Sequence, residues 1–148
     1  MPDIEIRDAV EGDLAEVLRV LAESGIDGAH SFTVDEAREH LGRIRQRSNY
    51  RLLVALADGE ILGTYSLVIV DKLGKRGMPA GVVEDVAVSP SAQRKGVGRA
   101  MMAHAIEECR KAGCYKVALS SNLKRTDAHG FYESLGFERH GYSLAVFL

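Results

Sequence analysis

Residues 81–100 read GVVEDVAVSPSAQRKGVGRA, and this stretch decides the fold. Residues 82–88 form an apolar, β-branched run with the length of a strand, which the Ser-Pro-Ser of residues 89–91 ends. A basic turn with two glycines follows, and a helical pattern begins directly after it. The free amides and the dipole of a helix N-terminus favour an anion, and glycine lets the backbone approach it closely. The stretch therefore predicts a pyrophosphate site at the start of a helix.

The spacing of the turn distinguishes between known phosphate-binding loops. A P-loop needs Lys-Ser/Thr after its second glycine, and the turn lacks this pair. The dinucleotide fingerprint needs a third glycine where Met101 stands. The pattern Gln-x-x-Gly-x-Gly does fit, at Gln93, Gly96 and Gly98, and it resembles the acetyl-CoA pyrophosphate loop of the GNAT N-acetyltransferase family. Taken alone, the same residues could instead form a basic turn that only caps an ordinary helix.

The composition limits the class of protein. The 148 residues are 46% hydrophobic and 27% charged, which predicts one soluble domain over residues 1–148. The net charge of −2 gives no bulk basic surface for nucleic acid, and no run approaches the ~20 apolar residues of a membrane span. The charged start of the chain lacks the apolar run of a signal peptide, so we expect a cytoplasmic protein. We expect Cys109 and Cys114 to be reduced, and we expect no metal, because no Cys/His cluster has ligand spacing.

The rest of the chain reads as alternating strands and helices. Asp-Gly at residues 58–59 joins two apolar runs, which is a signature of a hairpin. Thr33 and Glu36 are spaced as a capping box, and Asp13 can cap an earlier helix. We expect strands at residues 4–6, 51–57, 60–70, 82–88, 115–120 and once or twice within 137–148, and helices at 14–23, 34–46, 97–112 and 127–135. This order implies a mixed α/β sheet with helices on both faces.

Two segments have more than one interpretation. The loop of residues 71–80 carries Lys72, Lys75 and Arg76, which could contact an anionic acceptor or simply be solvated. The two helices before residue 50, with the loop between them, could form a lid over an acceptor site or only cover the sheet. The residues alone do not favour either lid or cover.

The resemblance to the GNAT family extends over residues 50–148. Its pieces come in the family's order: the strand VVEDVAVSP, the turn QRKGVG, the strand GCYKVALSSN and the helix DAHGFYESLGF. The last piece is similar to the family's pattern Ala-x-x-Phe/Leu-Tyr-x-x-x-Gly-Phe, and its residues here are Ala128, Phe131, Tyr132, Gly136 and Phe137. EDVAV and GCYKV resemble glucosamine-6-phosphate N-acetyltransferases, whereas SSNLKRTDAHGFY resembles aminoalkylphosphonate N-acetyltransferases. Many members carry Asn three residues before the helix Ala, where this chain has Arg125 and its Asn is Asn122.

The resemblance implies the GNAT fold, a mostly antiparallel mixed sheet of six or seven strands with helices on both faces. It also implies direct transfer of the acetyl group of acetyl-CoA to the primary amine of a small molecule. The backbone of Val86, Ala87 and Val88 would pair with the pantetheine arm. The turn would hold the pyrophosphate through Gln93, Arg94, Lys95, Gly96, Val97, Gly98 and Arg99. Asn122, Phe131 and Tyr132 would complete the acetyl-CoA site, although Phe131 could instead pack against the sheet.

Two residues are candidates for proton transfer. An alkylamine has a pKa near that of Lys, ~10.4, so it must lose a proton before it attacks, and the leaving thiolate must gain one. Glu84 lies two positions before Val86, which in a regular strand is the same face, and it is the candidate base. Alternatively, Glu84 or Asp85 only binds the acceptor ammonium. Tyr132 matches the family's general acid toward the CoA sulfur, and the alternative is an aromatic core residue.

Other activities remain open at this point. The acceptor could be a protein N-terminus or a lysine side chain, provided that an open groove admits a peptide. A non-catalytic CoA-binding module would keep the glycine turn without turnover. Homodimers are common among similar proteins, and the apolar residues 144–148 could contribute to one. We therefore expect acetyl-CoA and a small amine as ligands, a homodimer, and neither nucleic acid nor a membrane as partner.

Overall fold

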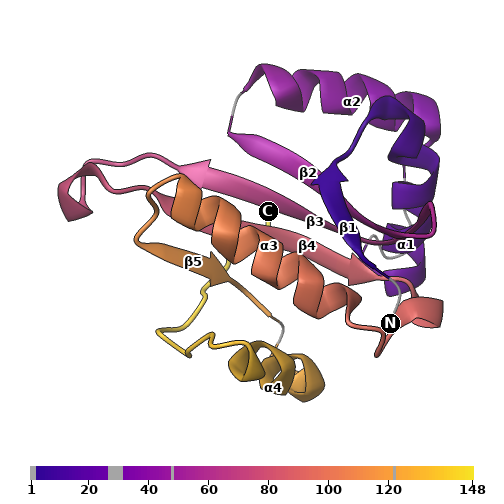
Figure 1. Ribbon diagram of the computed structural model, residues 1–148. Coiled ribbons are helices and arrows are strands. Elements are labelled where there is room, and N and C mark those ends of the chain that lie inside the picture. Colours follow the sequence, from indigo (N-terminus) through magenta and orange to yellow (C-terminus); the bar gives the residue numbers. More distant parts are fainter. Residues whose placement is uncertain (1–2, 27–31, 48, 122) are drawn as a thin grey trace. The chain divides into compact units, whose positions relative to one another are not determined.

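The computed structural model describes residues 3–26, 32–47, 49–121 and 123–148 (Figure 1). In chain order the elements are β1 (Glu5–Asp8), η1 (Glu11–Asp13), α1 (Leu14–Ser24), α2 (Val34–Gln46), β2 (Tyr50–Ala57), β3 (Glu60–Val70), η2 (Lys75–Gly77), β4 (Ala80–Val88), η3 (Pro90–Ala92), α3 (Val97–Lys111), β5 (Lys116–Leu119) and α4 (Thr126–Ser134). The chain divides into two compact units, residues 1–118 and 119–148, and each is described by itself. Among the described residues, no helix is both long enough and apolar enough to span a membrane.

The described strands form one sheet in the order β1-β2-β3-β4-β5. Neighbours from β1 to β4 are antiparallel. The predicted hairpin between β2 and β3 is confirmed: Asp58 and Gly59 both have positive φ, 52° and 77°, as the tight turn between twisted strands requires. The sheet is mixed and matches the expected class, but it has five strands where six or seven were expected.

Helices cover both faces of the sheet, as predicted (Figure 1). On one face α3 lies so close that a Cβ on Gly63 would stand 2.8 Å from a methyl carbon of Val97. A Cβ on Gly81 would stand 2.2 Å from Sγ of Cys109. On the other face α1 contributes to a buried cluster with the strands, made of Ala9, Val17, Val20, Val54, Leu56, Ile61 and Ala87. The two glycines therefore let α3 approach the strands closely.

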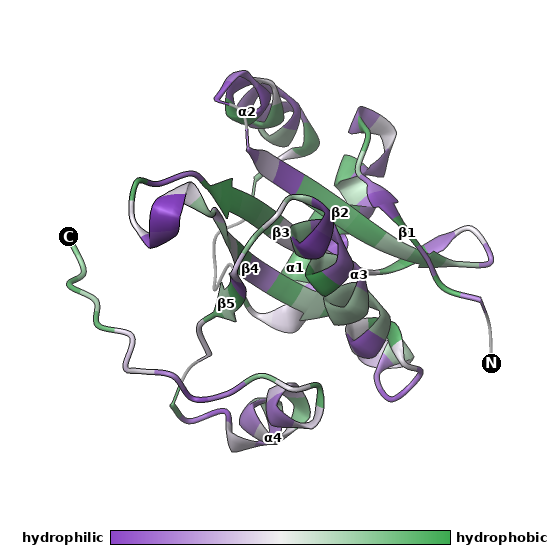
Figure 2. Cartoon of the chain, turned by 60° about the vertical axis from the view of Figure 1, so that its left-hand side comes forward, coloured by the Kyte–Doolittle hydropathy of each residue, from purple (hydrophilic) through white to green (hydrophobic). Residues whose placement is uncertain are grey.

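The core consists of apolar side chains from the sheet and from the helices that cover it. Met101 and Met102 of α3 are both fully buried in it. Hydrophobic colour runs along β2, β3 and β4 in Figure 2, while the outer side of α2 is hydrophilic. Burial of this apolar area is the main stabilising term of such a domain.

The helix starts differ in how closely they follow the sequence. The capping box is confirmed, because Thr33 Oγ1 accepts from the Glu36 amide at 3.2 Å and Glu36 accepts from the Thr33 amide at 3.0 Å. The capping role expected of Asp13 is wrong: its side chain makes no capping bond to α1. Asp13 instead accepts from the Val10 amide at 2.8 Å and pairs with Arg7 at 2.7 Å. The guanidinium of Arg7 is the stronger partner, and it lowers the pKa of Asp13.

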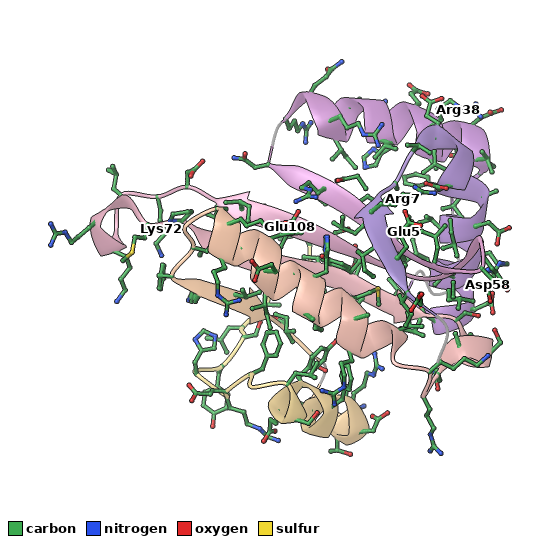
Figure 3. The ribbon with its side chains drawn as sticks, in the orientation of Figure 1. Glu5, Arg7, Arg38, Asp58, Lys72 and Glu108 are labelled. Atoms are coloured by element: carbon green, nitrogen blue, oxygen red, sulfur yellow. The ribbon has the colours of Figure 1, made fainter. Side chains whose placement is uncertain are left out.

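A polar network lies between the strands and α3. Arg51 donates to Asp8 and to Glu108, in each case at 2.9 Å. These hydrogen bonds to Arg51 are the main reason that the pKa values of Asp8 and Glu108 are lowered. Nearby, the Tyr65 hydroxyl and His104 Nδ1 are 2.7 Å apart. Figure 3 labels Glu108 on α3, from which this network links the helix to β1 and β2.

The second unit contains α4 and a tail without regular structure. Gly136, with a φ of 97°, ends α4 as expected. The expected strands within residues 137–148 are wrong, because the structure describes these residues without a strand. Tyr142, Leu144 and Val146 keep the alternation of a strand, yet all are more than four-fifths exposed. Alternation alone makes no strand, because a strand also needs a neighbour to hydrogen-bond.

Candidate functional site

The predicted anion turn lies where the sequence placed it, between β4 and α3. Gly96 is the N-cap of α3, with a φ of 83°, and Arg94 also has a positive φ of 67°. No side chain makes a capping hydrogen bond at this end of α3. The first-turn amides are therefore not taken by a cap, which is the condition for binding an anion there. Gln93, Arg94, Lys95 and Arg99 are all exposed around the turn.

Some of the expected cofactor residues can act only through their backbone. Val97 is 2% exposed, with its side chain against the sheet beside Gly63. Ala87 is 3% exposed and belongs to the apolar cluster under α1. Val86 and Val88 are half-buried. This agrees with a pantetheine arm that pairs with main-chain groups of β4, since such pairing uses no side chain.

A β-bulge interrupts β4 in the middle of the candidate site. Ser66 of β3 pairs with Glu84, but the residue two positions earlier in β3 pairs with Ala87, three positions after Glu84. Strand β4 therefore carries one extra residue, and Asp85 there has a left-handed backbone with a φ of 51°. A bulge bends the strand and re-aims its peptide groups. Such features concentrate at active sites.

The bulge corrects one expectation about Glu84. We expected Glu84 and Val86 to share a face because they are two residues apart. The extra residue shifts the alternation by one, so Glu84 shares its face with Ala87 instead. This is the face covered by α1, opposite to α3. Glu84 itself is exposed on that face, and Asp85, next in the chain, is exposed at the bulge.

A pair of hydroxyls lies beside Glu84 on the same face. The Tyr50 hydroxyl and Ser66 Oγ are 2.5 Å apart, and Ser66 is the register partner of Glu84. The pKa of Tyr50 is raised, first because the phenol is buried and then because the Asp85 and Glu84 carboxylates lie nearby. Sequence analysis missed both hydroxyls. The alternation along residues 50–54 could have indicated the face of Tyr50, but no local pattern reveals which residue of β3 it meets.

Tyr132 and Phe131 lie on α4, in the second unit. The Tyr132 ring stands 5.3 Å from that of Phe131 and 5.8 Å from that of Phe137, in both cases edge to face. A phenol of ordinary pKa is already protonated at neutral pH, and burial raises the pKa of Tyr132 further, so the group carries a proton that it can donate. The expected contact of Asn122 lies outside the described residues. The turn and Glu84 belong to the first unit, and the two sets are described separately.

Lysines of the β3–β4 loop and of β5 lie around the ring of Tyr115. Lys72 Nζ donates to the Tyr115 hydroxyl at 2.7 Å, and this bond is the main reason that the pKa of Tyr115 is lowered. The ammonium groups of Lys72, Lys75 and Lys116 stand 4.7, 5.8 and 5.6 Å from the Tyr115 ring centroid. Figure 3 places Lys72 and Asp58 at opposite ends of the sheet. An anionic acceptor and simple solvation both remain open for this loop.

Relatives with recorded activities cover most of the chain. A glucosamine 6-phosphate N-acetyltransferase of Trypanosoma brucei brucei is 32% identical over 142 residues, which are 93% of this chain and 91% of the relative. An aminoalkylphosphonate N-acetyltransferase of Salmonella typhimurium is 36% identical over 91 residues, but these are 62% of this chain and 57% of the relative. Both subgroups had been indicated by separate segments of the sequence.

Solved structures and the family's sequence model agree with these relatives. A crystal structure of an acetyltransferase from Trypanosoma brucei has a TM-score of 0.84 and 33% identity, and covers 99% of this chain and 100% of its own. A putative acetyltransferase from Agrobacterium tumefaciens has a TM-score of 0.90 and 28% identity, with 97% and 99% covered. The sequence model of the Acetyltransferase (GNAT) family matches residues 17–137. The chain therefore belongs to the GNAT family of acetyltransferases.

Proposed function

We propose that this acetyltransferase moves the acetyl group of acetyl-CoA directly to the primary amine of a small molecule, with Glu84 as base and Tyr132 as acid. One observation carries the proposal. The bulge of β4 puts an exposed carboxylate beside re-aimed peptide groups, on the strand that leads into a helix N-terminus with no capping side chain. The bulge can present an amide to the thioester, and the helix start can hold the pyrophosphate.

Acetyl-CoA would bind along the segment from β4 to the start of α3. Backbone groups of Val86, Ala87 and Val88 would pair with the pantetheine arm, and an amide near Val86 would polarise the thioester carbonyl. The pyrophosphate would meet the amides of the first turn of α3 and the exposed side chains around it, namely Gln93, Arg94, Lys95 and Arg99. By resemblance to the family, Asn122 and Phe131 would also contact acetyl-CoA.

The transfer removes two protons from the nitrogen, adds one to the sulfur and exchanges a C–S bond for a C–N bond. Glu84 takes a proton from the ammonium, directly or through water, and the free amine attacks the thioester carbon. The new C–N bond forms as the C–S bond breaks, and Tyr132 gives its proton to the sulfur. The nitrogen then loses its second proton to water, the Tyr132 phenolate takes one back from water, and Glu84 releases the proton that it took from the ammonium. Holding both substrates together supplies the remaining acceleration.

The relatives support a small-molecule acceptor. The two described above are named for glucosamine 6-phosphate and for aminoalkylphosphonates, and a third, from Stenotrophomonas maltophilia, is named an aminoglycoside N(6')-acetyltransferase. All three names describe primary amines on small polar molecules. A relative named for a ribosomal protein's alanine covers only 36% of this chain. A small amine is therefore the favoured acceptor over a protein.

The exposed tail supports a homodimer. Tyr142, Leu144 and Val146 alternate along an extended segment and are 94%, 91% and 82% exposed. Exposed apolar residues gathered in one segment mark a contact surface. We expect light scattering to give twice the chain mass for the protein and the monomer mass for a Leu144→Ser/Val146→Ser variant. An unchanged monomer for both proteins would refute the homodimer.

Calorimetric titration with acetyl-CoA tests the site, and release of CoA in the presence of amines tests the reaction. We expect saturable binding that Gly98→Trp abolishes, because the indole fills the place of the pyrophosphate. Gly42→Trp is the matched control, since a Cβ at Gly42 has no neighbour within 4 Å. Glu84→Gln should keep binding and lose turnover. The proposal fails if none of glucosamine 6-phosphate, 2-aminoethylphosphonate and an aminoglycoside raises CoA release above hydrolysis.

A further inference from the structure

A rigid hydroxyl lies on the sheet face that carries Glu84. Ser66 is 1% exposed, so its hydroxyl is fixed in the interior, and it holds the hydroxyl of the half-buried Tyr50 at 2.5 Å. Two hydroxyls that share one hydrogen bond keep a free lone pair on the donor. When Tyr50 donates to Ser66, the phenolic oxygen of Tyr50 therefore faces outward as an acceptor.

The strand pairings bring this hydroxyl to the same side as Glu84. Tyr50 pairs with Val68, and Ser66 pairs with Glu84. Residues 66 and 68 share one face of β3, so Tyr50 and Glu84 share it as well. Glu84 is exposed there, and Asp85, also exposed, follows it at the bulge. The two carboxylates also contribute to the raised pKa of Tyr50, after burial, which is consistent with their nearness.

We propose that Tyr50 is a specificity-determining residue, whose phenolic oxygen joins the carboxylates of Glu84 and Asp85 in binding the primary ammonium of the acceptor. Ser66 acts through Tyr50 as a positioning residue. This inference rests on the proposed function, because it takes Glu84 to face the acceptor. It adds a hydroxyl ligand for the nitrogen and a reason to prefer primary amines.

The number of donors on the nitrogen gives that preference. A primary ammonium has three N–H donors, and the face offers three acceptors, one from each of the two carboxylates and one from the phenol. An N-methylated ammonium has one donor fewer. The exposed carboxylates can bind water in place of the missing donor, but the half-buried Tyr50 oxygen cannot do so as readily, so the methylated amine should bind more weakly.

Steady-state kinetics with glucosamine 6-phosphate and 2-aminoethylphosphonate test the inference. Removing one hydrogen bond to a charged group costs about a factor of 10 or more, so Tyr50→Phe should raise the KM of the amine at least about tenfold. The KM of acetyl-CoA should not change. Ser66→Ala should act in the same direction, and the double variant should be no worse than Tyr50→Phe, because both changes break one bond. Ser66→Thr, which keeps the hydroxyl, should restore the KM.

A matched control separates this role from a general loss of packing. Thr64→Val removes a hydroxyl from the same face of β3, but that hydroxyl donates to the Leu53 carbonyl at 2.8 Å. This variant should leave the KM of the amine unchanged. An amine KM within about twofold of the parent for Tyr50→Phe, or an equal rise for acetyl-CoA, would overturn the inference.

A spectroscopic titration tests the same contact without turnover. In protein carrying tyrosine labelled with ¹³C at Cζ, the Tyr50 signal is identified by its loss in Tyr50→Phe. We expect this signal to move on addition of either amine in the presence of CoA, and to move less with the N-methylated amine. A Tyr50 signal that stays still with both amines overturns the inference even where turnover proceeds. A moving signal without any CoA release would support the contact and refute the proposed reaction.

Discussion

The contact of α3 with the start of β4 predicts a strong and compensable destabilisation. In Gly81→Ala the new Cβ would stand 2.2 Å from Sγ of Cys109, where an ordinary contact needs about 3.5–4.0 Å. Cys109 is 1% exposed within a helix, so its side chain has little room to move away. Overpacking of this kind costs about 1–3 kcal/mol, and we expect a value near the upper end. Cys109→Ala alone removes one buried sulfur and should cost about 1 kcal/mol.

The double variant distinguishes packing from other causes. Without the sulfur, the nearest atom to the new Cβ is Cβ of residue 109 at 3.4 Å, which is close to an ordinary contact. Gly81→Ala/Cys109→Ala should therefore be destabilised by only about 1 kcal/mol, against about 4 kcal/mol if the two changes were independent. Urea unfolding followed by circular dichroism measures this, since the chain has no tryptophan. Additive single effects would refute the close approach of α3 and β4. Gly42→Ala is the control and should stabilise the protein by about 0.5–1 kcal/mol, as expected within a helix.

Three further predictions concern ionisation. Lys72→Met should raise the pKa of Tyr115 toward its ordinary value, because the variant loses the hydrogen bond that is the main cause of the lowered pKa. Absorbance at 295 nm follows ionisation of the phenol, and an unchanged pKa of Tyr115 would contradict the contact. Asp85→Asn should lower the pKa of Tyr50 but leave it above the ordinary value, because burial is the larger cause. Arg51 lowers the pKa values of Asp8 and Glu108, so it contributes stability that is present above their unfolded values of about 3.9 and 4.3 and is lost as the pH falls below them. Arg51→Met should remove that part of the acid dependence of unfolding, and an unchanged acid profile would show that the network contributes nothing.

Local patterns in the sequence predicted the turns and the helix ends. The predictions for Asp58-Gly59, for the capping box at Thr33 and for the glycine at the start of α3 were correct, because each depends on residues within one turn of the chain. The glycine turn could be assigned to acetyl-CoA only through its resemblance to a family. Its chemistry alone indicated an anion and no particular one.

Long-range pairing accounts for what the sequence did not predict. The bulge at Asp85 became visible only when β3 and β4 were paired, because nothing in EDVAV marks an extra residue. The Tyr50–Ser66 contact likewise joins two strands through a register that no local pattern reveals. The closing strands failed for a related reason. The alternating tail lacks a described strand to pair with, and alternation does not supply one.

The extra residue in β4 shifts the alternation of its side chains by one position. Up to Glu84 the even-numbered residues face α1, and after the bulge Ala87, an odd-numbered residue, faces it. Deleting residue 85 would restore regular alternation without turning the later side chains, because Ala87 would then stand two positions after Glu84 and keep the face that it has now. The deletion would remove only the bend and the re-aimed peptide groups of the bulge. It would thus separate the contribution of the bulge from that of the side chains on either side of it.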